Sequence, residues 1–187
     1  MNVVIVHGSN SKDREKIKEG YAPQNKRNWI PWIKEQLEKK GIKCETPLMP
    51  ENWNPNYQKW KKEFDKINID ENSILIGHSA GGAFVTRWLG ESKRKIKKMI
   101  LVVPWKELWL DSKENKEFCN FDIDKSIAER IGKIIIFTSD YSEEKERAIF
   151  FNKSLPSKLI ELKGRGHFIE KHMGTKEFPE LLKEILK

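Results

Sequence analysis

Ser79 lies in a short segment whose residue types could support nucleophilic catalysis. Residues 77–81 read GHSAG, which is the pattern Gly-x-Ser-x-Gly. The pattern is weak by itself, but an apolar run, 74–76, precedes it and a predicted helix, Ala80–Leu89, follows it. This chemistry requires a strand, a sharp turn and a helix, because the turn exposes the serine hydroxyl while the glycines leave room for two closely packed backbones. We therefore predict that Ser79 is a nucleophile.

A serine hydroxyl needs a general base, and histidine is the usual one. The sequence contains four histidines. His167 lies in a glycine-rich segment, 164–168, after the last predicted strand, and a loop at that place can reach back over the nucleophile. We assign the base to His167 and keep His172 as the reserve. The alternative is that His167 is an ordinary histidine of a surface loop.

The base in turn needs a carboxylate that fixes its tautomer and stabilises the imidazolium. Asp140 closely follows the predicted strand Lys133–Thr138, so we assign this role to it. Its alternative role is to cap the helix that follows. Asp111, Asp122 and Asp124 are weaker candidates, because they lie in or near an irregular segment.

Acyl transfer also needs hydrogen-bond donors for the oxyanion of the tetrahedral intermediate. The Ala80 amide is one candidate, because N–H groups at a helix start point toward negative charge. The second donor should come from the loop after the first strand, where the sequence is HGSN over 7–10. We assign it to the Ser9 amide, with Asn10 as the alternative. Each donor is typically worth about 3–4 kcal/mol of the barrier.

Short apolar runs alternate with stretches of helical periodicity, and these elements must position the site. Several runs are apolar without alternation, which favours strands covered on both faces. We predict an α/β fold with a mostly parallel sheet of about six strands, helices on both faces, and the site at the carboxyl ends of the strands. The predicted strands are Val3–Val6, Lys43–Pro47, Ser73–Ile76, Met99–Val103, Lys133–Thr138 and Lys158–Leu162. The predicted helices are Asn28–Lys40, Asn56–Ile67, Ala80–Leu89, Ile123–Ile131, Ser142–Ser154 and Thr175–Leu186.

Two segments, Ser9–Arg27 and Pro104–Phe121, lack a clear period and follow predicted strands. Both are therefore expected to border a pocket. The second segment carries Trp105, Trp109 and Phe118, for which ordinary packing is the simpler interpretation.

The composition bounds the class of protein. The chain has 187 residues, of which 37% are hydrophobic, so we expect one domain over 1–187 with a core that needs neither disulfides nor metals. No cluster has metal-ligand spacing, and we expect no cofactor. The two cysteines, Cys44 and Cys119, are expected to be reduced thiols. Without a secretory signal or a membrane-length apolar run, the sequence favours a cytoplasmic protein with no membrane partner.

The net charge of +8 raises the possibility of a polyanion partner. The lysines are mostly scattered and mixed with glutamates, which favours a solvated surface. The densest block, KRKIKK over 93–98, is expected to form a helix end or a connecting turn. No helix-turn-helix signal or zinc spacing supports nucleic-acid binding, so we expect no nucleic-acid partner.

These segments together resemble the small α/β-hydrolases of the bacterial YdeN type, a family that includes the human retinoblastoma-binding-protein serine hydrolase. The resemblance covers nearly the whole chain and rests on VVIVHG, NWIPWIKEQLEKKGIKCETPLMP, ILIGHSAGG, IIIFTSD and KGRGHF. It implies a Ser-Asp-His triad on Ser79, Asp140 and His167, and a compact α/β-hydrolase domain without a large cap domain. The segment Ser9–Arg27 looks longer here than in such relatives, which bears on the shape of the pocket.

The sequence therefore predicts a serine hydrolase that cleaves a small carboxylic ester, or an amide, through an acyl-enzyme. The alternative is a binding or regulatory protein on a hydrolase fold, because fold does not fix function. A nucleophile, an acid and a base in the chain order of α/β-hydrolases favour the enzyme.

Overall fold

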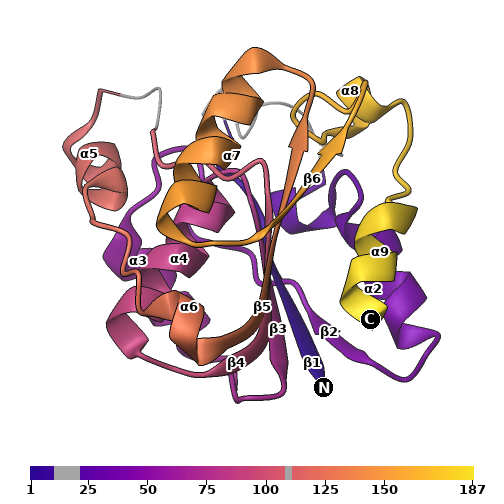
Figure 1. The fold of residues 1–187 in the computed structure, drawn as a ribbon, viewed down its shortest axis with the longest axis horizontal. Coiled ribbons are helices and arrows are strands. Elements are labelled where there is room, and N and C mark those ends of the chain that lie inside the picture. Colours follow the sequence, from indigo (N-terminus) through magenta and orange to yellow (C-terminus); the bar gives the residue numbers. More distant parts are fainter. Residues whose placement is uncertain (11–21, 108–110) are drawn as a thin grey trace.

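The computed structural model describes residues 1–10, 22–107 and 111–187, and its six strands form one parallel sheet (Figure 1). The strand order is β2-β1-β3-β4-β5-β6, and all five neighbouring pairs run parallel. The predicted α/β sheet of about six strands is confirmed. The strands are β1 (Asn2–Val6), β2 (Lys43–Glu45), β3 (Ser73–His78), β4 (Ile96–Val102), β5 (Ile131–Ser139) and β6 (Lys158–Leu162).

Helices cover both faces of this sheet. In β1, Val4 and Val6 join one buried cluster while Val3 and Ile5 join the other, as the period of two along a strand requires. The first cluster also contains residues of α3 to α7, and the second contains residues of α2 and α9, which lie together on one side in Figure 1. The helices are η1 (Gln24–Lys26), α2 (Ile30–Glu38), α3 (Tyr57–Phe64), α4 (Ala80–Ser92), α5 (Lys113–Cys119), α6 (Ile127–Arg130), α7 (Ser142–Ser154), α8 (Glu170–Met173) and α9 (Pro179–Leu186).

Several stretches differ from the prediction. The predicted helix Ile123–Ile131 is reduced to the short α6, because Ile131 already pairs with Ile96 in the sheet. The predicted irregular segment contains α5, whose first turn is capped by Ser112 Oγ. The predicted C-terminal helix begins only at Pro179, since proline is suited to the first helical turn.

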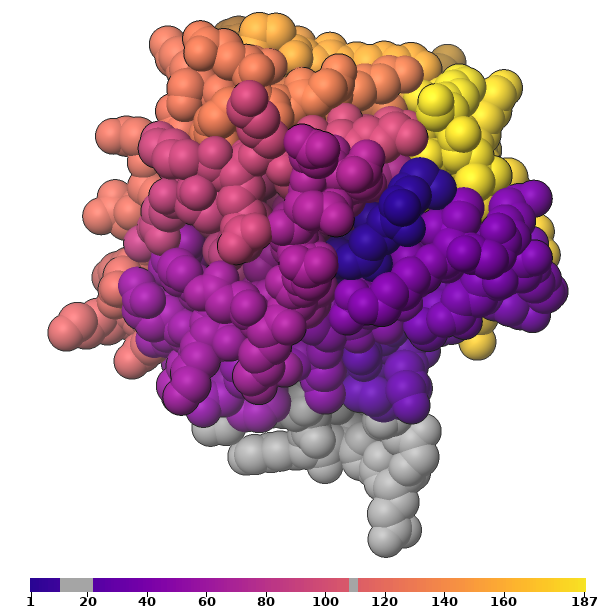
Figure 2. Space-filling view, turned by 90° about the horizontal axis from the view of Figure 1, so that it is seen from below, coloured from indigo at the N-terminus to yellow at the C-terminus, as the bar shows by residue number. Residues whose placement is uncertain are grey.

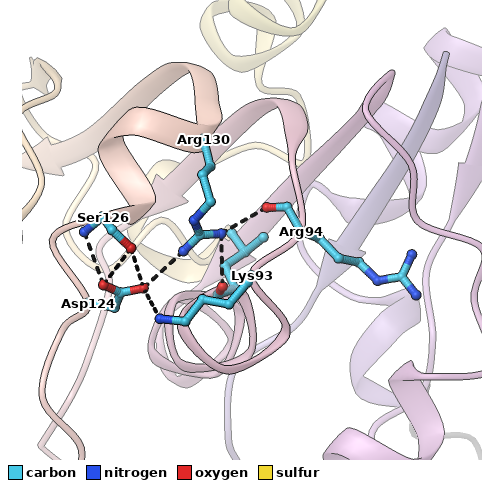
Figure 3. A network of polar contacts seen from close by, with 6 residues as sticks. Lys93, Arg94, Asp124, Ser126 and Arg130 are labelled. Carbon is cyan, nitrogen blue, oxygen red and sulfur yellow. Dashed lines mark hydrogen bonds and ion pairs between the residues drawn. The ribbon is translucent and has the colours of Figure 1, made fainter.

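The residues before α6 are held by polar contacts on Asp124 (Figure 3). Lys93 Nζ and Arg130 Nη2 lie 2.8 and 2.9 Å from Asp124 Oδ2, and Ser126 donates through its backbone N–H and its hydroxyl. These hydrogen bonds, that of Lys93 first, hold the pKa of Asp124 below its usual range. Arg130 also donates to the backbone oxygen of Arg94. The network connects the end of α4 to the start of β5. The Asp124 carboxylate therefore has a structural role at this place.

The basic block 93–98 begins with the C-cap residue of α4, as expected for a helix end, and also contains the first residues of β4, which begins three residues before the predicted strand Met99–Val103. Lys98 lies in β4 and is 3% exposed, and its Nζ donates to the backbone oxygens of Glu184 and Ile185 at 2.5 and 3.2 Å. Burial, followed by the charge of nearby lysines, lowers its pKa. Lys98 thereby joins the sheet to the last turn of α9. Figure 2 shows the start of the chain (indigo) at the surface close to the C-terminal residues (yellow).

The described residues include no helix that is long and apolar enough to cross a membrane.

Candidate active site

Ser79 occupies the sharp turn between β3 and α4. Its backbone has φ 55° and ψ −123°, a strained conformation for a residue with a side chain. The turn is held in place, because the Ser79 N–H donates to Val102 O at 3.0 Å and Ser79 O accepts from the amides of Gly82 and Trp105. The side chain is therefore fixed at the carboxyl end of the sheet, where the prediction placed it.

The glycines around Ser79 have the steric role that the sequence suggested. A Cβ on Gly77 would lie 2.5 Å from Gly81 O, and a Cβ on Gly81 would lie 2.6 Å from His7 O. Such atoms would collide with backbone that cannot move. Gly8, in the loop after β1, passes even closer to the nucleophile, because a Cβ there would lie 2.8 Å from Ser79 Cβ and 3.2 Å from Ser79 Oγ.

The loop that carries His167 is held by two other histidines. His78 Nε2 lies 2.9 Å from the backbone oxygen of His167, so this ring nitrogen donates. The backbone N–H of His167 donates to His172 Nδ1 at 3.0 Å. Gly166, with φ 47°, passes against the His172 ring, and a Cβ there would lie 2.7 Å from Nδ1. His172, the reserve base in the prediction, thus contacts the backbone of the preferred base.

The carboxylate that contacts the His167 ring is Glu144, not the predicted Asp140. His167 Nδ1 lies 2.7 Å from Glu144 Oε1, and Glu144 is 5% exposed. A proton on Nδ1, shared with the carboxylate, leaves a lone pair on Nε2, as a general base requires. Asp140 is exposed, and its Oδ1 accepts from the amide of Gly164 at 2.9 Å.

The difference follows from position in the fold. Glu144 lies in the first turn of α7, which turns its side chain inward, while Asp140 lies in the connection before the helix. Asp140 instead supports the loop of His167 through Gly164. Two of the weaker candidates are engaged elsewhere: Asp111 is paired with Lys116, and Asp124 belongs to the network beside α6. The third, Asp122, is exposed.

Of the two predicted oxyanion donors, Ala80 directly follows Ser79 in the chain, and Ser9 comes from the loop after β1. Ala80 is the first residue of α4, and Ser9 follows Gly8 directly in the cavity that also contains Ser79. The Asn10 amide, the alternative donor, donates to Asn52 O at 3.0 Å. This engagement favours Ser9 over Asn10.

Two buried histidines lie beneath the site and are neutral. His7 Nε2 accepts from the Met49 amide at 3.0 Å, so its proton lies on Nδ1, which donates to Gly8 O. Burial lowers the pKa of His7 to about 4. Burial, followed by the charge of His167, lowers the pKa of His78 to about 3. Both rings serve as fixed hydrogen-bonding groups at neutral pH.

Ser79 and His167 both line a cavity of about 900 Å³. Segments from the first half of the chain, including η1 and Asn28, form one part of its lining, and α8 with the residues beside it forms another. Most of the segment Ser9–Arg27 that was expected over the site lies outside the described residues, as does Trp109. Trp105 does border the site, since its ring centroid lies 5.4 Å from that of His167. Within the described residues no group of three or more His, Cys, Asp and Glu side chains could hold a metal ion.

The comparisons with known proteins identify the family and the fold. The profile of the family described as serine hydrolase matches residues 16–186. The chain belongs to the serine hydrolase family. No curated protein matches this serine hydrolase.

Solved structures with the same fold cover nearly the whole chain. The ydeN gene product of B. subtilis has a TM-score of 0.83 at 20% identity, covering 99% of this chain and 96% of its own. Est1E of Butyrivibrio proteoclasticus, solved with ferulic acid bound, has a TM-score of 0.66 at 15% identity, covering 100% and 88%. The methylesterase MES16 of Arabidopsis has a TM-score of 0.63 at 12% identity, covering 100% and 99%. The protein is thus a member of the serine hydrolase family, and its α/β-hydrolase fold is that of the ydeN gene product.

Sequence reasoning missed Glu144 and the supporting role of His172. The sequence carries a signal for the first. Glu144 lies on the predicted helix Ser142–Ser154, four residues after Asp140, and residues four apart can reach the same neighbour. It carries only a weak signal for the second, namely the spacing of His172 after the glycine-rich loop.

Proposed function

We propose that this serine hydrolase cleaves small carboxylic esters through an acyl-enzyme. The observation that carries the proposal is the contact of a buried carboxylate, Glu144, with His167 beside the strained Ser79. Est1E and the methylesterase MES16, which share the fold, support an ester as the substrate class. The substrate would be a small molecule, since it must enter a cavity of about 900 Å³.

In the proposed reaction, His167 Nε2 takes the proton of the Ser79 hydroxyl as its oxygen attacks the ester carbon. The tetrahedral oxyanion accepts hydrogen bonds from the amides of Ser9 and Ala80. His167 then returns the proton to the leaving alcohol, and a water molecule repeats the sequence on the acyl-enzyme. Glu144 stabilises the imidazolium that forms in each half, because the opposite charge lies beside it in a buried position.

A fluorophosphonate probe tests the nucleophile. The wild-type protein should be labelled and Ser79→Ala should not, while Ser73→Ala, a serine at the start of the same strand, should be labelled like wild type. Equal labelling of wild type and Ser79→Ala would contradict the proposal. If the wild type is not labelled and hydrolyses no short p-nitrophenyl ester, the binding or regulatory alternative is favoured.

A further inference from the structure

The charged groups around the Ser79 cavity are mostly basic. Its described lining has four basic side chains and one carboxylate, those of Lys26, Arg27, Lys171, Lys176 and Glu170. The excess of three positive charges could simply reflect the net charge of the chain. A second cavity, of about 770 Å³ between α5 and α7, does not share the excess, which argues against this explanation. Its described lining has three basic and four acidic side chains, so the basic excess is local to the Ser79 cavity.

The one carboxylate of the Ser79 lining is partly balanced already. Lys176 Nζ lies 3.7 Å from Glu170 Oε1. Lys26 and Lys171 are both exposed, and their ammonium groups can therefore turn toward a ligand in the cavity.

A hydrogen bond brings these cations together although they are far apart in sequence. The Glu170 amide donates to Asn28 Oδ1 at 3.0 Å, which joins the segment after η1 to the start of α8. Lys26 precedes Asn28 by two residues, and Lys171 follows Glu170 directly. Positive charge from two segments is thus gathered at one junction beside the site. An anionic group there would be attracted over a distance comparable with the Debye length, roughly 10 Å at 0.1 M salt.

We propose that the preferred ester carries an anionic group, a carboxylate on its acyl side or on its alcohol side, which Lys26 and Lys171 attract. This inference rests on the proposed ester hydrolysis. A neutral ester of the same size would enter the cavity without this attraction. The effect should fall as salt is added, because exposed charges are screened.

Binding to Ser79→Ala tests the inference without any turnover. Monomethyl adipate carries one carboxylate, and dimethyl adipate is its neutral counterpart. At low ionic strength the monoester should bind about tenfold more tightly by calorimetric titration, since two or three exposed cations each contribute up to about fivefold. Equal binding of the two compounds would overturn the inference.

Turnover tests the same inference and locates the anion. For the acyl side, mono-p-nitrophenyl adipate is compared with its methyl ester, and for the alcohol side, 4-acetoxybenzoate is compared with its methyl ester. Rates with Ser79→Ala are subtracted, which removes hydrolysis that does not depend on the site. We expect the anionic member of at least one pair to have the higher kcat/KM, by about tenfold at low salt.

A matched pair of double variants shows which lysines are responsible. Lys26→Glu with Lys171→Glu should lower the preference for the anion at least about fivefold and leave the neutral esters within about twofold. Lys62→Glu with Lys153→Glu, which changes the net charge equally at exposed lysines of α3 and α7, should leave the preference intact. Equal loss in both double variants would overturn the inference. If none of these esters is hydrolysed, the proposed function fails, and the binding comparison still decides whether the cavity selects an anion.

Discussion

Helix α7 lies between the region of Ser79 and the cavity between α5 and α7. It presents glutamates to both, but their contacts differ. Glu144 turns inward and contacts His167, while Glu143 and Glu146 line the cavity between α5 and α7. All four histidines of the chain belong to the region of Ser79, and none lines the second cavity. The second cavity also contains exposed Phe150 and a balanced set of charges. The comparison shows that cavity size does not identify a site, since the two volumes are similar and only one region combines a strained serine with a carboxylate-bound histidine.

The largest expected effect is a difference in kcat between substitutions on the two faces of α7. Glu144→Gln should lower kcat by about 10³–10⁴, because the His167 tautomer and the imidazolium lose their carboxylate. Glu146→Gln, on the exposed face of the same helix, should leave kcat within about twofold. Steady-state kinetics with p-nitrophenyl acetate measure both.

The same assay decides between the two carboxylates near the His167 loop. Asp140→Asn should lower kcat by less than about tenfold, since its oxygen accepts from Gly164 and an amide oxygen can do the same. A loss of about 10⁴ in Asp140→Asn, with little change in Glu144→Gln, would return the acid role to Asp140 and break the comparison.

Acid should destabilise the protein through the buried histidines of the Ser79 region. The pKa of His7 is about 4 and that of His78 about 3 in the folded protein, against 6.5 in the unfolded chain. Below pH 6.5 the unfolded chain therefore binds more protons, and the free energy of unfolding falls as pH falls, until it levels off near the folded values. Between pH 7 and pH 5 each histidine should contribute a loss of about 2 kcal/mol.

Urea unfolding at pH 7 and at pH 5 measures this loss, and His7→Gln provides the comparison. The variant should be less stable at both pH values but should lose about 2 kcal/mol less between them. An unchanged loss in the variant would mean that His7 titrates normally in the folded protein.

A smaller catalytic effect is expected from His172, which holds the His167 loop by its Nδ1. His172→Asn can place an oxygen near the position of Nδ1 and should keep kcat within about threefold, whereas His172→Ala should lower it about tenfold, the value of one lost hydrogen bond. The pH profile adds a second readout. Protonation of His172 removes its acceptor, so the acid limb of kcat should be less steep in His172→Asn than in wild type. Similar kcat in all three proteins would show that the loop does not depend on His172.

The smallest effect is expected in the second cavity. Phe150→Ala should change kcat/KM for short p-nitrophenyl esters by less than about twofold, because Phe150 is 48% exposed and lies outside the lining of the Ser79 cavity. A loss greater than about fivefold would place part of the substrate between α5 and α7.

The sequence was sufficient for the sheet and for the serine turn because local signals determine both. Continuous apolar runs predicted the strands, and glycines marked the turn around Ser79 where two backbones meet. The sequence was insufficient to identify the carboxylate that contacts His167, because the choice between Asp140 and Glu144 depends on which face α7 presents to the loop after β6. It also placed the start of β4 three residues too late, at Met99 and not at Ile96, because the burial of Lys98 depends on carbonyl groups nearly ninety residues away. Long-range partners of polar groups have no local pattern, and that is where the predictions failed.

The contact of Lys98 with α9 has a practical consequence for handling the protein. The buried ammonium depends on the backbone oxygens of Glu184 and Ile185, so trimming by a carboxypeptidase or deletion of the last four residues would leave a cation without these acceptors. An affinity tag fused after Lys187 would be tolerated only if its linker lets α9 keep its last turn. The solubility of such a fusion would therefore depend on whether the contact between Lys98 and α9 is kept, as well as on the tag itself.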